Sequence, residues 1–471
     1  MQLLKLQNTT KTKLFALSAL ITLCNINGFS QTESIPPELK NLIVHAIDSS
    51  YTLKNKEIEV QQTLIQKTSV WETYLPKLSA DGMYATGAAD ITLDIPKKTG
   101  MILQLPQSGE MTFNNKANFS LATLNASMPL FTGFKVPYSA KALEQKKAAQ
   151  QFLIEKDKAE IVRDVIKTYD MLAVLKQSEL VLDESAKRLE YEKHLSDKAL
   201  ENELIAPYEQ KKIEIAILSL DAKRVELTGN KKLVIQKLSM LTHLPEDTIS
   251  KLNVNITAWV IENTEGTIEN RAELKALDAA FLANKFKMKS DQYYWLPKIQ
   301  AMGTYGYANV GDLNIKTPFY HPLLKSNIEL DVTKTEINPA WYVGVGFKWE
   351  IFDGFHGHHI NQTAKLEMQK TLNSKYEAEN LLNLNLQKSK VDLQVANQQL
   401  KIKQKQVEYE QSILQQSIKS YHEGLISINE RITEETEFQK IQLDYIQAIY
   451  NQRLNAVNYL DATGLLTKQS F

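Results

Sequence analysis

An internal duplication limits how this chain can fold more than any other feature of its sequence. The stretch YLPKL at Tyr74–Leu78 recurs as WLPKI at Trp295–Ile299, 221 positions further on. At the same offset, PLFTGF at 129–134 matches EIFDGF at 350–355. Matches continue in one register from about residue 50 to residue 244, with no net insertion. Solenoid repeats span about 20–50 residues, so a period this long indicates two tandem halves, each the size of a domain.

Each half begins with a helical stretch, at 53–74 and 273–294, that ends at a Leu-Pro pair. Pro76 and Pro297 cannot continue the hydrogen-bond ladder of a helix, and they bias the preceding residue toward an extended backbone. The residues after each proline alternate aromatic and small side chains, which is typical of a strand. We therefore expect a helix-to-strand transition at both prolines.

A second strand is expected to complete the β portion of each half. Trp341–Phe352 has the clearest two-residue alternation in the chain, and 120–131 repeats it more weakly. About thirty residues with several prolines separate the strands of each half, so long surface loops are expected there. The predicted strands are at about 77–87, 118–131, 298–308 and 341–352.

Long helices are predicted after the strands. Gly133 and Gly354, in the F-x-G-F motif, mark the change from strand to helix, and no Gly or Pro occurs from 138 to 206 or from 358 to 423. Apolar residues recur at heptad spacing in the first of these runs, which predicts a coiled-coil seam. The predicted helices are long ones at about 137–202 and 358–423 and returning ones at about 208–241 and 428–462.

These elements define the domain plan. The first repeat spans 31–244, a linker with little helical periodicity spans 245–270, the second repeat spans 271–465, and a tail spans 466–471. The expected fold class is mainly α with a membrane β-barrel portion, built from two tandem helix-strand-strand-helix halves. Four strands cannot close a barrel, because the smallest membrane barrels have eight. Three copies of the chain would supply twelve.

The N-terminus has the parts of a signal peptide. Three lysines precede an apolar run at Leu14–Cys24, and Gly28 and Ser30 stand before a cleavage site that would remove residues 1–30. The only cysteine, Cys24, lies in this segment, and its lipidation is the alternative to cleavage. No later apolar run approaches the roughly 20 residues of a membrane helix. An exported chain of this kind is secreted, periplasmic, or embedded in a membrane as a β-barrel.

Composition and motifs argue against several classes of function. The 55 acidic and 55 basic residues give a formal net charge of +0, so no general field attracts nucleic acid. No Ser/His/Asp group, glycine-rich phosphate loop or pair of carboxylates stands out, and we expect neither enzymatic activity nor a cofactor. His356, His358 and His359 lie together without an accompanying cysteine or carboxylate cluster, so no metal site is predicted.

The order of the elements, with the Leu-Pro-Lys transition, the F-x-G-F return and the Y-x-x-G-L-I-S turn at Tyr421–Ser427, resembles the TolC-like outer-membrane efflux proteins. The resemblance covers about residues 35–465. It implies a homotrimer in the cell outer membrane, with one shared twelve-stranded barrel and a helical tunnel across the periplasm. It also implies two partners, a periplasmic adaptor protein and an inner-membrane pump. The chain would then be a passive exit duct for tripartite efflux or type I secretion.

The resemblance also identifies candidate residues near the turns between long and returning helices. It places an acidic residue at Glu430, with Glu209 as its repeat mate, and three copies of each would form carboxylate rings at the channel entrance. The alternative is that both are exposed glutamates at helix starts, where the helix dipole favours carboxylates. Many relatives have a second acidic residue one turn on, where this chain has Thr433. An arginine that locks the entrance would correspond to Ile426, and Arg431 lies nearby but out of register.

The turns themselves are the expected contacts with the adaptor. Their residues are Leu204, Ile205 and Ala206 in the first half and Gly424, Leu425, Ile426 and Ser427 in the second. Gly424 is expected to be the flexible turn residue. Because Glu203 occupies the matching position in the first half, the two turns are not expected to be equivalent.

The competing function is a soluble periplasmic coiled-coil scaffold or adaptor with an ordinary small sheet. An adaptor would usually have one helical hairpin, whereas this chain has two in tandem. The alternation in Trp341–Ile351 discriminates the two functions, because its apolar face meets lipid in a barrel and a protein core in a soluble sheet.

Overall fold

The computed structural model describes residues 36–95, 109–261, 265–321 and 323–468. The expected signal peptide at 1–30, with Cys24, lies outside these residues. The chain forms two compact units. One contains residues 55–153 and 273–378, and the other contains residues up to 54, 154–272 and 379–471.

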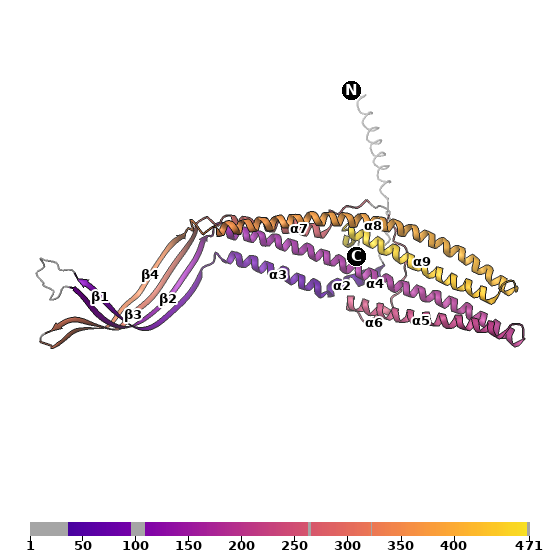
Figure 1. The fold of residues 1–471 in the computed structure, drawn as a ribbon, viewed down its shortest axis with the longest axis horizontal. Helices are drawn as coiled ribbons and strands as arrows, with labels where there is room; N and C mark the ends of the chain where they lie inside the picture. The colour runs from indigo at the N-terminus through magenta and orange to yellow at the C-terminus, as the bar shows by residue number, and fades with distance from the viewer. Residues whose placement is uncertain (1–35, 96–108, 262–264, 322, 469–471) are drawn as a thin grey trace, which may run out of the picture. The chain divides into compact units, whose positions relative to one another are not determined.

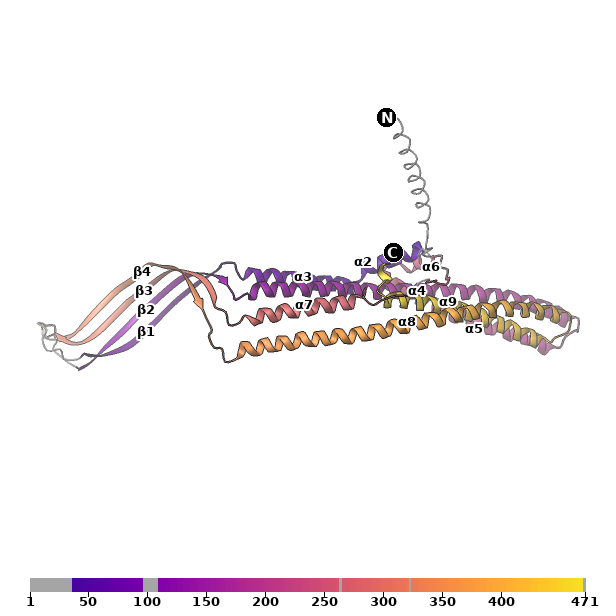
Figure 2. The same cartoon turned by 90° about the horizontal axis from the view of Figure 1, so that it is seen from above.

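The strands of the first unit form one antiparallel sheet in the order β1-β2-β3-β4, and they run side by side in both views (Figures 1 and 2). Their bounds are β1 Lys77–Ile95, β2 Gly109–Phe131, β3 Lys298–His321 and β4 Ser326–Lys348. The order leaves β1 and β4 as the two edges of the sheet.

The strands are much longer than the expected 77–87, 118–131 and 298–308, and the expected thirty-residue loops are wrong. Most of those residues belong to the strands, because the alternation of apolar and polar side chains continues in DITLDI at 90–95 and IELDVTKTEI at 328–337. Pro339 is tolerated because it lies on an edge strand, at a break in the β3–β4 register. The last strand ends at Lys348 rather than at 352.

The transitions lie beside the predicted residues. Pro76 and Pro297 stand directly before Lys77 and Lys298, the first residues of β1 and β3. Gly133 and Gly354 stand two residues before α4 Lys135–Glu201 and α8 His356–His422 and have left-handed φ values of 65° and 68°. Glycine suits that conformation because it has no Cβ.

The two halves repeat one another in their helix contacts. In the first half, α3 Tyr51–Glu72 packs on α4, and Thr63 Oγ1 donates to Gln150 Oε1 at 2.8 Å. In the second half, α7 Ala272–Gln292 packs on α8, and Asn284 Nδ2 donates to Thr371 Oγ1 at 2.8 Å. Each partner of the second pair lies 221 positions after its partner in the first, so the duplication is structural as well as sequential.

The other unit contains the later parts of α4 and α8 with shorter helices. These are α2 Pro37–Ser49, α5 Pro207–Thr242, α6 Glu246–Ser250, α9 Ile428–Ala462 and the short 3-10 helix η1 Leu466–Lys468. Its hydrophobic core gathers buried side chains from α2, α4, α5, α8 and α9. Helix α2 was not expected, and its buried residues are Leu39, Leu42, Ile43 and Ala46.

Residues 245–270 are not a free linker. Ile249, Val254, Ile256 and Trp259 are buried in the core of this unit. The backbone of Trp259 is held on both sides by Gln452 of α9, at 2.8 Å to its N–H and 2.7 Å to its carbonyl. After α6, residues 252–261 form neither helix nor strand, and backbone groups of Thr257 and Trp259 are paired with side chains of α9.

A buried ion pair joins this segment to two helices. Arg453 Nε of α9 lies 2.9 Å from Asp170 Oδ2 of α4, and Arg453 Nη1 donates to the carbonyl of Thr257 at 3.1 Å. The guanidinium also lies 5.3 Å from the ring centroid of Trp259. Burial raises the pKa of Asp170, and the charge of Arg453 opposes that rise.

The turns at the far ends of the long helices have the same backbone. Glu203 and Gly424 both adopt left-handed φ values, 59° and 72°. Leu204 N–H bonds to Ala199 O at 2.8 Å and Leu425 N–H bonds to Ser420 O at 2.8 Å, the six-to-one bond that ends many helices. The expectation that the turns differ is therefore wrong for the backbone, because this bond pattern imposes the left-handed conformation on glutamate as on glycine.

Replacing Arg453 by methionine is expected to destabilise the core. The change leaves Asp170 buried without its cation, which costs about 3–5 kcal/mol in comparable sites. Denaturant unfolding of the full chain in mild detergent, followed through tryptophan fluorescence, measures the loss. The double variant R453M with D170L should recover most of the stability. If the double variant is no more stable than R453M, the ion pair is not the source of the loss.

Replacing Glu203 by glycine is expected to stabilise the first turn by roughly 0.5–1 kcal/mol. Relief of the left-handed strain favours the change, and the added freedom of glycine in the unfolded chain partly opposes it. Hydrogen exchange of the amides at the end of α4 measures the effect. The matched control is Gly424→Glu, which should lose a similar amount at the second turn. Faster exchange in E203G would contradict the strain argument.

Candidate functional site at the helix turns

The residues expected to contact an adaptor lie at the two turns of the coiled-coil helices. Leu204 and Leu425 are their most exposed large side chains, at 75% and 70% of the residue surface. Ile205, Ala206 and Ile426 are half-buried, and Gly424 and Ser427 are exposed. Each turn therefore presents one leucine in an equivalent backbone position.

The two helices that follow the turns start differently. Ala206, before α5, has no side chain that can cap the helix, and Pro207 occupies the first helical position. Ser427, before α9, forms a capping box with Glu430. The Ser427 N–H donates to Glu430 Oε2 at 2.8 Å, and the Ser427 hydroxyl donates to the same oxygen at 3.0 Å.

The Glu430 carboxylate therefore accepts hydrogen bonds at the start of its own helix. This position agrees with the alternative given above, an exposed glutamate at a helix start. Those bonds from Ser427 hold the pKa of Glu430 below its ordinary value of 4.5. A carboxyl with a lowered pKa stays ionised to lower pH, so its contribution to the cap is present above pH 4.5 and is lost as the pH falls through the folded-state pKa. Glu430 is exposed, and a charge at this position remains accessible.

Glu209 occupies the matching position in the first turn of α5 and is half-buried. The Tyr208 hydroxyl reaches it at 3.5 Å. Burial, followed by the charges of Glu192 and Glu209, raises the pKa of Tyr421 near the end of α8.

A buried ion cluster lies beside the turns, formed by Arg188 and Glu192 of α4 with Arg431 and Glu435 of α9; of these, only Arg431 was named from the sequence. Arg188 Nε and Nη2 lie 3.0 and 2.9 Å from Glu435 Oε1. Arg431 Nη1 and Nη2 both lie 3.2 Å from Glu435 Oε2, and Arg431 Nε lies 3.4 Å from Glu192 Oε1. Ser185 donates to Glu435 Oε1 at 2.8 Å.

The buried ion cluster contains two positive and two negative charges. Arg431 and Glu435 are each 1% exposed, and an unpaired charge at such a site costs several kcal/mol. The cluster therefore favours one position of α9 along α4. The signal in the sequence was the spacing of Arg431 and Glu435, which are four apart on the same helix face as the buried Ile428 and Phe438.

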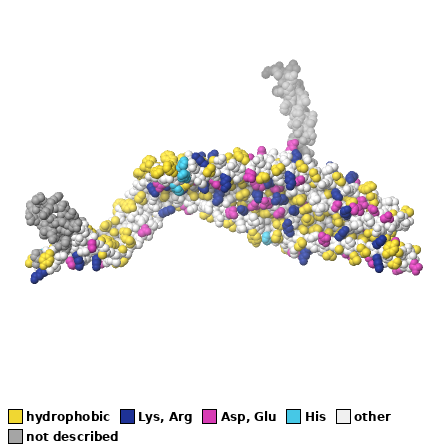
Figure 3. All heavy atoms as spheres, viewed as in Figure 1, with side chains coloured by type: hydrophobic (Ala, Val, Ile, Leu, Met, Phe, Trp, Pro, Cys, Tyr) yellow, Lys and Arg dark blue, Asp and Glu magenta, His cyan; other side chains and the backbone are white. Residues whose placement is uncertain are grey.

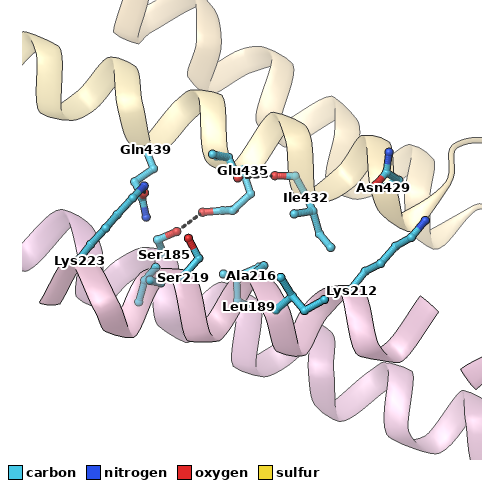
Figure 4. Close-up of a pocket in the computed structure, with 13 residues that line it drawn as sticks. Ser185, Leu189, Lys212, Ala216, Ser219, Lys223, Asn429, Ile432, Glu435 and Gln439 are labelled. Atoms are coloured by element: carbon cyan, nitrogen blue, oxygen red, sulfur yellow. Dashed lines mark hydrogen bonds between the residues drawn. The ribbon is translucent and has the colours of Figure 1, made fainter. Parts of the chain in front are cut away.

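A cavity of about 310 Å³ lies next to the buried ion cluster, bounded by α4, α5 and α9 (Figure 4). Figure 4 shows Lys212 and Lys223 of α5 reaching toward α9, where Asn429 and Gln439 line the opposite side. Lys223 Nζ donates to Gln439 Oε1 at 2.7 Å. The lining combines apolar side chains with amines and amides, so it offers both apolar surface and hydrogen-bonding groups to a non-covalent ligand.

The described residues contain neither a metal-binding group nor a membrane-crossing helix. Within the parts of the chain that the structure describes, no group of three or more His, Cys, Asp or Glu side chains could hold a metal ion, and this includes His356, His358 and His359. Among the described helices, none combines the length and the hydropathy that a membrane-crossing helix requires.

Comparisons with known proteins find similar structures but no similar sequences. The sequence matches no protein-family model and no curated protein sequence. Among solved structures, the transmembrane channel protein CusC is similar with a TM-score of 0.70 at 14% identity, over 90% of this chain and 92% of that one. The CmeC outer membrane channel of Campylobacter jejuni gives a TM-score of 0.67 at 15% identity, over 92% and 87%. The outer membrane protein VceC of Vibrio cholerae gives 0.67 at 14% identity, over 91% and 96%.

These similarities span nearly the whole chain and include both the sheet and the long helices. At 12–15% identity they establish the fold. The mainly helical fold with a β portion is thereby confirmed, and the chain has the fold of the TolC-like outer-membrane efflux channels that the order of its motifs indicated.

Proposed function

We propose that this protein is a passive exit duct in the outer membrane, serving a tripartite efflux or type I secretion system. The observation that carries the proposal is the open four-stranded sheet joined to two 67-residue helices, a plan similar to solved outer-membrane channels over about 90% of the chain. Residues 1–30 would direct export and be removed. No chemistry or cofactor is required of a conduit, and the energy for transport would come from a pump.

The exposed face of β4 supports a membrane location. Trp341, Val343, Val345 and Phe347 are exposed by 70%, 81%, 69% and 75%. In a soluble scaffold with a small sheet, one face of these strands would be covered by a protein core. An apolar stripe of this kind instead suits contact with lipid, with the helices extending into the periplasm.

The edges of the sheet support assembly. Each chain has unpaired backbone groups on β1 and β4, and such edges do not occur in hydrocarbon. Three copies would pair all edges in one twelve-stranded barrel. Their helices would together enclose the tunnel.

The helix turns are the proposed entrance and docking site. The exposed Leu204 and Leu425 would contact a periplasmic adaptor, which in turn would join the duct to an inner-membrane pump. Glu209 and Glu430 would form two rings of carboxylates that favour cations. The buried ion cluster would fix α9 against α4 just behind this entrance.

The native mass of the mature chain is the first test of this function. After extraction of cell envelopes in mild detergent, we expect a trimer that requires detergent, because the apolar face of β4 would otherwise be exposed to water. Size-exclusion chromatography with light scattering measures the mass. A monomer or dimer released without detergent would instead support the soluble scaffold.

Replacing both Glu209 and Glu430 by alanine is expected to bring the ratio of cation to anion permeability closer to one. The double change removes the six carboxylates of the two proposed rings in a trimer. Single-channel recordings in planar bilayers under a salt gradient measure the ratio of cation to anion permeability. Ser427→Ala is the control, since it breaks the cap of α9 and keeps both carboxylates. Unchanged selectivity in the double variant, or an equal shift in S427A, would remove the acidic-ring assignment.

A further inference from the structure

The return from strand to helix occurs twice in this chain with the same local geometry. Phe131 and Phe134 meet edge to face at 5.2 Å and 88°, and Phe352 and Phe355 do so at 5.4 Å and 88°. The glycine between each pair has nearly the same φ. Strand pairing agrees as well, because Lys77↔Ser127 in β1–β2 becomes Lys298↔Lys348 in β3–β4.

The first return is covered by the other half of the chain. A Cβ on Gly133 would lie 3.2 Å from the carbonyl oxygen of Tyr293 and 3.4 Å from Leu296 Cβ. Tyr138 stacks on Tyr293 with ring centroids 5.7 Å apart and planes at 14°. Strand β2 pairs with β3 beside this contact. We call this set of contacts, α4 and β2 against α7 and β3, the internal junction.

The second return has no such cover. Nothing lies within 4 Å of a Cβ built on Gly354, and Phe352 and Phe355 are exposed. Figure 3 shows hydrophobic side chains gathered together with histidines where the strands meet the helices. The repeat mates of Tyr293 and Leu296 are Glu72 and Leu75, which are also exposed, at the end of α3 and next to the free edge strand β1.

We propose that these two open surfaces bind each other between copies of the chain, with the register of the internal junction. Helix α8 and strand β4 of one copy would lie against α3 and β1 of a second copy as α4 and β2 lie against α7 and β3. The proposal rests on the assembly proposed above and adds to it the residues that meet. Leu75 of the second copy would fill the open space at Gly354.

Transfer of the β2–β3 register gives the strand pairs between copies. Ser127↔Met302, Leu124↔Tyr305 and Thr123↔Gly306 become Lys348↔Asp81, Val345↔Tyr84 and Gly344↔Ala85. These pairs put Lys348 of one copy directly opposite Asp81 of the next, where the internal junction has no charge. Opposite charges at directly paired positions stabilise a sheet.

The same register matches the two faces of the sheet. Val345 and Tyr84 are both exposed apolar residues, and they fall on one face. Lys348 and Asp81 fall on the other. A slip by one residue would turn each strand's apolar set to the opposite face, so the charge pair and the apolar pair support one register together.

Four helical residues that meet in the internal junction are replaced by different residue types in the junction between copies. In the internal junction, the ammonium groups of Lys141 and Lys289 lie 5.7 and 5.8 Å from the ring centroid of Tyr138. In the junction between copies, His359 replaces Tyr138 and Glu72 replaces Tyr293. The two lysines become Gln362 and Thr68. An aromatic stack with its cations is thus replaced by an imidazole that can donate to a carboxylate.

Disulfide cross-linking tests this register. The chain has a single cysteine, Cys24, which is replaced by serine in every variant. Ala85→Cys with Gly344→Cys places the two thiols on directly paired residues of neighbouring copies, and nothing within 4 Å obstructs a side chain at Gly344. The control is A85C with Ala340→Cys, which moves one thiol four residues, roughly 13 Å, along the same face.

Under mild oxidation in isolated envelopes, we expect A85C/G344C to give covalent dimers and trimers on denaturing gels that reductant removes. The control pair and the single variants should stay monomeric on the gel. Native mass in detergent is measured on the same samples. A trimer in detergent that cross-links equally through the control pair, or through neither pair, would overturn the register and leave the assembly standing. A monomer in detergent for the native chain would overturn both.

A charge exchange tests the ion pair without cysteines. Lys348→Asp is expected to reduce the trimeric fraction several-fold after mild heating in detergent, because it sets two carboxylates opposite each other at every contact between copies. Adding Asp81→Lys to it should restore the native fraction. If the exchanged pair is no better than K348D alone, Lys348 does not face Asp81.

Discussion

The requirement that every strand edge find a partner controls the rest of this structure. Backbone N–H and C=O groups cannot stay unpaired in hydrocarbon, and the sheet of one chain has two free edges. Within one chain, β2 of the first half pairs with β3 of the second half, which leaves one edge of each half unpaired. In the proposed assembly a second copy pairs the remaining edges, so the duplication would supply in one chain a structural template for the contact between chains.

The helical unit relies on a different constraint, the cost of burying charge. Its long helices bury a narrow apolar seam, and the buried charges of Asp170, Glu435, Arg431 and Arg453 each lie against an opposite charge. Arg453 joins α9 to Asp170 and to the segment before α7. Near the turns, Arg431 and Glu435 bind Glu192 and Arg188 and so hold α9 to α4. Such pairs add little net stability compared with apolar packing, and their better attested effect is to select one packing register. They suit helices whose repeating seam would otherwise allow sliding.

Elements set by local chemistry could be predicted from the sequence. The prolines at 76 and 297, the glycines at 133 and 354, and the absence of Gly and Pro from 138 to 206 and from 358 to 423 placed the transitions and the long helices. The strand lengths could not be predicted, since the prolines between the expected strands suggested loops, and the edge strand β4 tolerates Pro339 at a break in its register. The core segment around Trp259 and the contacts of Arg431 and Glu435 with Glu192 and Arg188 depend on residues that are far apart in the sequence. Single-residue patterns do not report such contacts.

The equal size of α4 and α8 has an evolutionary consequence. Both helices contain 67 residues and start and end at the same offset. Removing a residue from one helix rotates the part beyond it by about 100° and shortens the helix by about 1.5 Å. The charged side chains and the turn beyond the deletion then no longer align with the other hairpin. A change in length is thus tolerated only when it occurs in both halves, and in steps close to whole heptads. The helices of this chain should therefore vary in length across species in matched, stepwise pairs.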